Sequence, residues 1–209
     1  MKGKFIVLEG IDNCGKSTQA KMLEKYFLDL GTDVVLAREP GGTQMGEEIR
    51  EVVLKPRDQM ANPVTQTLLF YAARTEFMDQ VVKPNLDAGK MVITDRFESS
   101  TYVYQGIVQG VDLSLLDTLS EYCVKNSGAY PDLFIIIDIP TEESIKRGAN
   151  ADRKGQDLIY EMQGVQFLEK LRQGYLTFAS AHPDTVKVID GMQSKEDLFK
   201  EITGLLINE

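Results

Sequence analysis

The sequence is poor in several residue types, and each scarcity excludes a class of protein. Its 209 residues include two cysteines, one histidine and no tryptophan. Two cysteines cannot build the disulfide framework of a small secreted protein, and we expect Cys14 and Cys123 to be free thiols. The single histidine, His182, lies in a polar segment typical of a surface turn, so it is a poor candidate for catalysis. No apolar run is long enough to span a bilayer, and we expect no membrane partner.

The charge balance is acidic, with 23 Lys and Arg against 32 Asp and Glu and a net charge of −9. Such a surface repels the backbone of a nucleic acid, which disfavours a polymer-binding function. The apolar stretch near Met1 is too short for the core of a signal peptide, so we expect a cytoplasmic protein. No stretch of Pro, Gly or Ser is long enough for a linker, so residues 1–209 are expected to form a single domain.

A phosphate-binding loop follows the first apolar run. Residues 10–17 match the pattern G-x-x-x-x-G-K-[ST] between a short apolar run and an amphipathic stretch. Glycines let backbone N–H groups surround an anion, the lysine supplies charge for the outer phosphates, and the serine hydroxyl can ligate magnesium. The residues expected to bind the nucleotide phosphates are Gly10, Ile11, Asp12, Asn13, Cys14, Gly15, Lys16, Ser17 and Thr18. The context disfavours the alternative, a glycine-rich turn without a ligand.

Short apolar runs alternate with amphipathic stretches along the chain. The runs at 5–8, 34–37, 91–94, 133–137 and 186–189 predict five strands. Helices are expected at 17–30, 45–54, 63–86, 99–105, 112–125, 141–147, 158–181 and 195–207, with Thr141 as an N-cap. This alternation predicts an α/β fold in three layers, with helices on both faces of a mostly parallel sheet.

Charged residues follow three of these expected strands. Arg38 and Glu39 follow the second, Asp95 and Arg96 the third, and Asp138 the fourth. Ligands of open α/β sheets bind at the carboxyl ends of the strands, so we expect these residues to face the crevice beside the phosphate loop. A carboxylate beside an arginine suits a metal and a phosphate together, so Asp95 is the expected metal ligand and Asp138 is expected to stabilise a loop. A solvated turn is the alternative for Arg38 and Glu39.

A polar segment at 147–155 concentrates cations and lacks apolar periodicity. In an acidic chain this predicts a short mobile lid at about 148–156, with an ordinary solvated loop as the alternative.

The helix expected at 63–86 places Arg74 on the same face as Phe70, four residues earlier. Taken alone, an aromatic residue such as Phe70 is more often part of the core than a ligand contact.

Three classes of phosphate-loop protein compete. A GTPase needs a guanine-reading Asn-Lys-x-Asp element, but the corresponding region at 137–140 reads Ile-Asp-Ile-Pro. A motor or transport ATPase is expected to carry an acidic pair after its metal-binding strand, but Asp95 is followed by Arg96. A small kinase needs two pockets, a second phosphate clamp and a closing lid, and each has candidates here. The cations available for phosphoryl transfer are Lys16, Arg38, Arg50, Arg96, Arg147 and Arg153.

Together these motifs resemble the thymidylate kinase family. They are the phosphate loop at 10–17, Arg-Glu-Pro-Gly-Gly-Thr at 38–43, Phe-Tyr-Ala-Ala-Arg at 70–74, Asp-Arg-Phe at 95–97 and Tyr-Gln-Gly at 104–106. The resemblance covers nearly the whole chain. It implies a P-loop NTPase fold and a magnesium-assisted transfer of phosphate from ATP to dTMP, which gives dTDP. It also implies a homodimer built from the helices expected at 63–86 and 112–125.

The resemblance implies roles for individual residues as well. Phe70 would stack on thymine, Arg74 would donate to a base carbonyl, and Tyr104 would disfavour a ribose 2′-hydroxyl. The other residues implied to contact dTMP are Arg38, Glu39, Pro40, Arg50, Arg96, Thr101, Gln105, Tyr160 and Glu161. The implied metal ligands are Ser17, Asp95 and Glu39, and the implied catalytic set is Lys16, Asp12, Arg96, Arg147 and Arg153.

The chain departs from the family pattern at two places. Asn13 stands where some members carry an arginine, so the lid arginines Arg147 and Arg153 are implied to compensate, with Arg153 preferred at the transition state. Phe97 replaces a more polar residue. Base choice rests on few side chains, so a kinase for dUMP or a modified base stays open. A nucleotide-binding regulator that kept the fold is disfavoured, because each catalytic position holds a usable residue.

Overall fold

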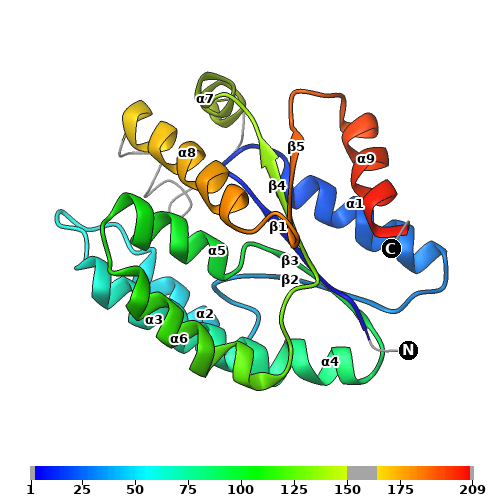
Figure 1. The fold of residues 1–209 in the computed structure, drawn as a ribbon, viewed down its shortest axis with the longest axis horizontal. Helices are drawn as coiled ribbons and strands as arrows, with labels where there is room; N and C mark the ends of the chain where they lie inside the picture. The colour runs from blue at the N-terminus through cyan, green and yellow to red at the C-terminus, as the bar shows by residue number, and fades with distance from the viewer. Residues whose placement is uncertain (1–2, 150–163, 208–209) are drawn as a thin grey trace.

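The core of the protein is a parallel sheet. The computed structural model describes residues 3–149 and 164–207. The strands are β1 (Phe5–Glu9), β2 (Val34–Arg38), β3 (Met91–Asp95), β4 (Leu133–Asp138) and β5 (Val186–Asp190). They form a five-stranded sheet in the order β2-β3-β1-β4-β5, and every neighbouring pair is parallel (Figure 1). The expected α/β class and parallel sheet are confirmed.

Each strand extends one residue beyond its apolar run and ends on a charged side chain. These terminal residues are Glu9, Arg38, Asp95, Asp138 and Asp190. β1 and β4 are buried almost throughout because helices cover both of their faces, whereas the edge strands β2 and β5 are partly exposed. All strands run the same way, so the five charged residues gather at one edge of the sheet. The apolar runs therefore form the core, and the charged residues that follow them lie together at the carboxyl ends of the strands.

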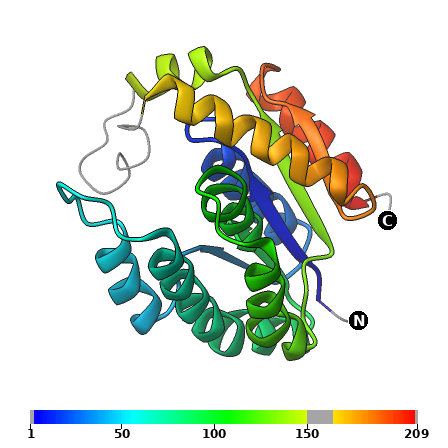
Figure 2. The same cartoon turned by 60° about the vertical axis from the view of Figure 1, so that its left-hand side comes forward.

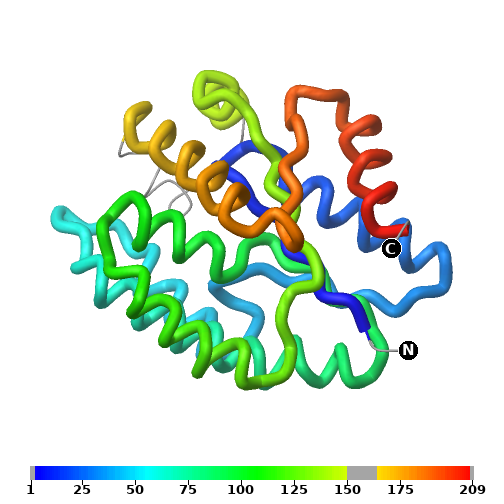
Figure 3. Tube along the Cα trace, in the orientation of Figure 1, coloured from blue at the N-terminus to red at the C-terminus, as the bar shows by residue number. Residues whose placement is uncertain are grey.

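Helices cover both faces of the sheet. They are α1 (Lys16–Asp29), α2 (Gln44–Val53), α3 (Pro63–Phe77), α4 (Lys83–Asp87), α5 (Glu98–Thr101), α6 (Leu113–Cys123), α7 (Thr141–Ala149), α8 (Val165–Ala181) and α9 (Lys195–Ile207). α1 and α9 pack on one face, and α5 and α8 on the other (Figures 1 and 2). α2, α3 and α6 form a further group, which the trace in Figure 3 shows below the sheet. In the described chain no helix is long and apolar enough to cross a membrane.

Two helices contain wide turns that the sequence pattern did not indicate. The stretch expected as one helix at 63–86 is α3, a π-helical segment (Met78–Val82) and α4. A second π-helical segment (Tyr102–Val108) follows α5. Pro84, at the start of α4, lacks the N–H that a regular α-helix would use there. The wide turn before it changes the hydrogen-bond register, so the missing donor is tolerated.

The expected N-cap at Thr141 is wrong. Thr141 is the first residue of α7, and its hydroxyl donates to Glu169 Oε2 of α8 at 2.6 Å. The carbonyl of Pro140 accepts the N–H groups of Glu143 and Ser144, which places the cap one residue earlier. The contact with α8 therefore engages the hydroxyl that local capping would have used.

The segment expected to form the lid falls mostly outside the described residues. α7 continues to residue 149, two residues beyond its expected end, and residues 150–163 are not described. α8 is described from Val165, after Gly164. The lid, Arg153, Tyr160 and Glu161 therefore stay predictions.

Candidate active site

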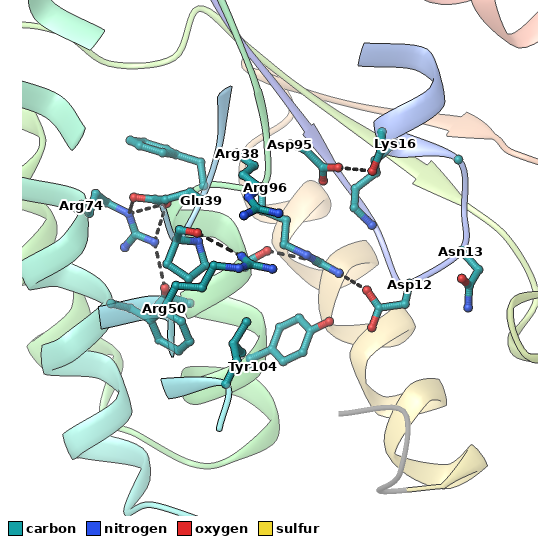
Figure 4. A pocket seen from close by; sticks show the side chains of 18 of the residues that line it. Asp12, Asn13, Lys16, Arg38, Glu39, Arg50, Arg74, Asp95, Arg96 and Tyr104 are labelled. Carbon is teal, nitrogen blue, oxygen red and sulfur yellow. Dashed lines mark hydrogen bonds and ion pairs between the residues drawn. The ribbon is translucent and has the colours of Figure 1, made fainter. Parts of the chain in front are cut away.

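A cavity opens at the carboxyl ends of the strands, beside the phosphate loop (Figure 4). Its volume is about 490 Å³, which is in the range of roughly 300–1,000 Å³ typical of small-molecule sites. Residues singled out from the sequence line it: Asp12, Asn13, Gly15, Lys16, Ser17, Thr18, Arg38, Glu39, Pro40, Arg50, Phe70, Arg74, Asp95, Arg96, Thr101, Tyr104, Gln105 and Arg147. The fold thus brings together candidates that are widely separated in sequence.

The phosphate loop joins β1 to α1 with backbone conformations that favour glycine. Gly10 has a φ of 132° and Gly15 a φ of 109°. A Cβ added at Gly10 would lie 2.5 Å from the carbonyl oxygen of Ile137 on the neighbouring strand, so a side chain does not fit. Lys16 Nζ donates to the carbonyls of Gly10 at 3.0 Å and Ile11 at 2.9 Å. A buried ammonium therefore lies inside the loop at a helix N-terminus, where an anion is favoured.

Ser17 and Asp95 meet at the cavity although they lie 78 positions apart. Asp95 ends β3, the strand beside β1, and its register partner is Leu8. The Ser17 hydroxyl donates to Asp95 Oδ2. Magnesium takes oxygen ligands, few of them from protein, and keeps phosphate oxygens and water as the others. Ser17 and Asp95 offer two oxygen ligands, a number that fits an ion completed by phosphate oxygens and water. The described residues contain no cluster of three or more His, Cys, Asp or Glu that could hold a metal ion.

Arg96 lies at the centre of the cavity wall. Its NH2 group pairs with Asp12, and NH1 donates to the carbonyl of Gly10 at 3.1 Å and to the Tyr175 hydroxyl at 2.9 Å. The guanidinium lies 5.5 Å from the centre of the Tyr104 ring. Figure 4 shows Arg96 between Asp12 and Tyr104. Burial alone lowers the pKa of Arg96, but the surrounding tyrosines and carboxylates outweigh it and raise the pKa, so the group stays cationic.

Arg74 and Glu39 form a buried ion pair. Arg74 Nε donates to both Glu39 oxygens at 2.9 Å, and its NH2 donates to the Thr101 hydroxyl at 3.1 Å. Burial raises the pKa of Glu39 to about 7, against the attraction of Arg74. In the described chain Arg74 NH1 is buried without a hydrogen-bond partner, so a donor remains for a ligand. Figure 4 shows the Glu39 carboxylate directed at Arg74 and not at Asp95.

Phe70 lies between a small apolar cluster and the cavity. It packs with Val53 and Leu54, apart from the main core, and is 9% exposed. Phe70 therefore packs in this cluster and also lines the cavity, where a ligand could reach it. Gln105 lines the same cavity, and its Nε2 donates to Gln66 Oε1 at 3.4 Å.

Two further arginines line the cavity, one at the end of β2 and one on α2. Arg38 is exposed and donates through NH2 to Glu47 Oε2 at 3.2 Å. Arg50 of α2 donates through NH1 to the carbonyl of Pro40 at 3.0 Å. Thr43 caps α2 by accepting a backbone N–H, which fixes where this helix begins. The end of β2 and helix α2 therefore each bring one cation to the cavity.

Arg147 reaches the cavity from α7. Its Nε donates to Glu143 Oε1 at 2.8 Å and its NH2 to the carbonyl of Gly191 at 3.1 Å. Asp138, by contrast, accepts two hydrogen bonds from Arg172 of α8, at 2.7 and 2.8 Å. Its contact joins β4 to α8, whereas the sequence predicted that Asp138 stabilises a loop.

Sequence reasoning missed Glu9, Ser100 and Tyr175, which lie beside Arg96. Glu9 carries the signal that identified Asp95, because it is a carboxylate directly after an apolar run. Tyr175 gives no such signal, since a tyrosine on an amphipathic helix is most often a core residue. Leu54 was also missed as a lining residue, because it looked only like the end of a helix.

The comparisons with known proteins agree on one family. A family model described as thymidylate kinase matches residues 8–202. The thymidylate kinase of Caldanaerobacter subterraneus subsp. tengcongensis is 44% identical over 92% of this chain and 89% of its own length. The thymidylate kinase of Thermoanaerobacter sp. strain X514 is 39% identical over 99% and 98%. A crystal structure of thymidylate kinase from Ehrlichia chaffeensis superposes with a TM-score of 0.77 at 32% identity, covering 99% of both chains.

Proposed function

The chain belongs to the thymidylate kinase family and phosphorylates dTMP to dTDP with ATP as donor, and we propose how its cavity performs this reaction. One observation carries the proposal. A single cavity joins a phosphate loop to a second pocket lined by arginines and a phenylalanine ring. Two phosphorylated ligands fit such a site, with positive charge concentrated where their phosphates approach each other.

The phosphate loop is proposed to bind the triphosphate of ATP. Lys16 would exchange its loop carbonyl partners for phosphate oxygens, because its ammonium already lies inside the loop. Ser17 and Asp95 are the proposed magnesium ligands, since their oxygens are already in contact at the end of β3. Bound magnesium supplies charge neutralisation and alignment of the phosphates. We do not assign Glu39 to the metal, because Arg74 binds both of its oxygens.

The second pocket is proposed to bind the thymine base. Phe70 would stack on the base, and Arg74 NH1 would donate to a base carbonyl. Glu39 holds the Arg74 guanidinium through two hydrogen bonds, so the arginine is oriented before the base arrives. Thr101 and Gln105 line the cavity on the adjoining helical segment and would meet the edge of the base.

The sugar and phosphate of dTMP are proposed to lie between Tyr104 and the arginines. Tyr104 is buried beside the cavity and would leave no room for a 2′-hydroxyl. Arg96 and Arg50 would hold the phosphate, with Arg38 at the rim. Asp12, paired with Arg96, would lie next to the same phosphate and fix the arginine rather than contact the dianion directly.

The transfer needs no covalent intermediate. An oxygen of the dTMP phosphate attacks the γ-phosphorus of ATP in line, the bond from that phosphorus to the β–γ bridging oxygen breaks, and ADP leaves. Lys16 and Arg96 would stabilise the charge on the transferred group. Arg147 lines the cavity as a further cation, and Arg153, outside the described residues, is proposed to join it. Loss of an arginine acting on the transition state costs on the order of 10³-fold or more in rate.

Transfer of a radiolabelled γ-phosphate tests the reaction. The label is expected in dTDP, only when dTMP and magnesium are present. Lys16→Ala should abolish transfer, whereas Lys21→Ala, an exposed lysine on the same helix, should retain it. Release of the label as inorganic phosphate in the presence of dTMP would contradict the proposal.

We also propose a cytoplasmic homodimer. α3 exposes Val64 and Leu68 at 42% and 49%, and α6 exposes Leu113 at 48%, which gives neighbouring helices apolar surface to bury. Leu68→Glu should convert a dimer to a monomer in light scattering, whereas Leu30→Glu, at an exposed residue that caps the C-terminal end of α1, should not. The cytoplasmic location is proposed from the two free thiols, which suit a reducing compartment.

A further inference from the structure

A buried carboxylate lies behind Arg96, and none of the roles above uses it. Glu9, the last residue of β1, is 0% exposed. Its Oε1 accepts the N–H of Phe97 at 2.9 Å. Its Oε2 accepts the hydroxyl of Ser100 at 2.8 Å and the hydroxyl of Tyr175 at 3.0 Å. The carboxylate is therefore compensated mainly by hydrogen bonds from neutral groups, which makes its burial tolerable.

The Tyr175 hydroxyl connects this carboxylate to Arg96. It accepts from Arg96 NH1 at 2.9 Å and donates to Glu9 Oε2 at 3.0 Å, whereas NH1 and Oε2 themselves are 3.9 Å apart. Tyr175 is 1% exposed on α8. Burial raises the pKa of Tyr175, so its hydroxyl stays protonated and remains a donor. The hydroxyl therefore separates two opposite charges that would otherwise move into direct contact.

The backbone of Arg96 is held as firmly as its side chain. Arg96 has a φ of 72°, a left-handed conformation that is unfavourable for a residue with a side chain. Its N–H donates to the carbonyl of Leu8 at 2.9 Å, and its carbonyl accepts the hydroxyl of Thr94 at 2.6 Å. The next N–H, from Phe97, donates to Glu9. Such a conformation persists only where the surroundings fix it, which happens most often at functional sites.

We propose that Tyr175, acting with Glu9, positions the guanidinium of Arg96 for the phosphate of the acceptor nucleotide. The inference rests on the role proposed above for Arg96. A free arginine side chain loses rotamer freedom when it binds a ligand, and a prepositioned one does not. The hydroxyl of Tyr175 keeps NH1 away from Glu9, so the rest of the guanidinium can face the cavity. Tyr175 is thus a positioning residue that contacts Arg96 but no reacting atom.

Tyr175→Phe tests the proposal, because it removes one oxygen and preserves the ring. Calorimetry of dTMP and of thymidine, which lacks the phosphate, should separate positioning from general damage. A hydrogen bond to a charged group contributes about tenfold in affinity, so dTMP should bind about tenfold more weakly and thymidine unchanged. Tyr102→Phe is the matched control, since the Tyr102 hydroxyl bonds Asp117 away from the cavity. Unchanged dTMP binding, or equal weakening of both ligands, would overturn the proposal.

A double-mutant cycle with Arg96→Ala decides whether Tyr175 acts through the arginine. In the Arg96→Ala background, Tyr175→Phe should have no further effect on dTMP affinity, and an additive loss would overturn the proposal. If Tyr175→Phe does not fold, Glu9→Gln carries the same comparison, because Glu9 Oε2 accepts the hydroxyl of Tyr175 and Glu9 does not line the cavity. The activity of the wild type tests the proposed function separately from the positioning role of Tyr175. If the wild type phosphorylates dTMP and Tyr175→Phe binds dTMP as tightly as the wild type, the proposed function stands and only the role of Tyr175 is wrong.

Discussion

Arg74 and Glu39 are joined by two hydrogen bonds of 2.9 Å from the Nε group of the arginine to the two carboxylate oxygens. Their side chains are 3% and 2% exposed, so the pair is buried in the cavity wall. Arg74 NH2 also donates to Thr101, and NH1 has no partner among the described groups. Breaking a buried pair leaves an uncompensated charge, so the geometry of Arg74 depends on the ionisation of Glu39.

Thymidine affinity is therefore expected to depend on pH. Burial raises the pKa of Glu39 to about 7, while Arg74 opposes the shift and Glu98 and Glu9 add to it. Below this pH Glu39 is neutral and holds Arg74 less firmly, so thymidine affinity should rise as the pH increases through about 7. Thymidine is the appropriate ligand because it has no phosphate that titrates in this range. Calorimetry across this range should show the dependence, and Glu39→Gln should abolish it.

The same ionisation has the opposite effect on stability. The folded state binds the Glu39 proton more tightly than the unfolded chain, so the stabilising contribution is fully present below the ordinary carboxyl pKa. It is lost as the pH rises through about 7. Thermal unfolding of the wild type and Glu39→Gln should therefore differ in pH dependence between these limits. Parallel curves would show that Glu39 does not titrate in this window.

Phe70→Leu should raise the KM for dTMP about tenfold, because base stacking contributes roughly 1–3 kcal/mol and leucine keeps the apolar volume without the ring. The KM for ATP should stay unchanged, since Phe70 lines the cavity on the side of the Arg74 pair. Phe199→Leu is a matched control, because its ring packs on Tyr26 in another part of the fold. Steady-state kinetics that show an unchanged KM for dTMP would remove the stacking role.

Tyr104→Ala should reduce discrimination against ribonucleotides. The Tyr104 ring is 6% exposed beside the cavity and packs against Tyr175, so its removal opens space where a 2′-hydroxyl would lie. The ratio of kcat/KM for dTMP and for its ribonucleotide counterpart should fall by about tenfold or more, the scale of a steric difference of one to three kcal/mol. Tyr122→Ala, on a residue that is 75% exposed, should leave the ratio unchanged. An unchanged ratio in Tyr104→Ala would place the sugar elsewhere.

Asp95→Asn should raise the magnesium concentration needed for half-maximal activity by about tenfold, since it removes charge from a proposed ligand. Asp138→Asn provides the comparison at the end of β4, on the other side of β1, where Arg172 binds the carboxylate instead. That variant should lose stability in thermal unfolding and keep its magnesium dependence. Equal shifts in the two variants would argue against Ser17 and Asp95 as the metal site.

The sequence predicted the sheet and the location of the site, but not the partners of the site residues. Apolar runs determined the strands, because parallel strands buried on both faces must be apolar throughout. Each strand is one residue longer than its apolar run, because it ends on a charged residue that an apolar pattern does not include. The Arg74 and Glu39 pair spans 35 positions, and no local pattern specifies such a contact. Thr141 shows the same limit, since its hydroxyl bonds a distant helix rather than its own.

The structure also explains why Tyr175 and Glu9 were missed. Their contact spans 166 positions and depends on how α8 packs on β4 and β5. A sequence pattern can place a tyrosine on the buried face of a helix, but it cannot show that the hydroxyl meets an arginine. The wide turns near Pro84 were missed for a related reason, because hydrogen-bond register is not visible in hydrophobic periodicity.

The most direct test of the central claim is a coupled assay of ADP release with ATP, magnesium and a panel of acceptors. The panel contains dTMP, dUMP, dCMP, dGMP, AMP and UMP, with a reaction without acceptor as the control. We expect the highest kcat/KM for dTMP and no ADP release without an acceptor. A higher value for another monophosphate would contradict the thymine pocket, and ADP release without an acceptor would contradict phosphoryl transfer to a nucleotide.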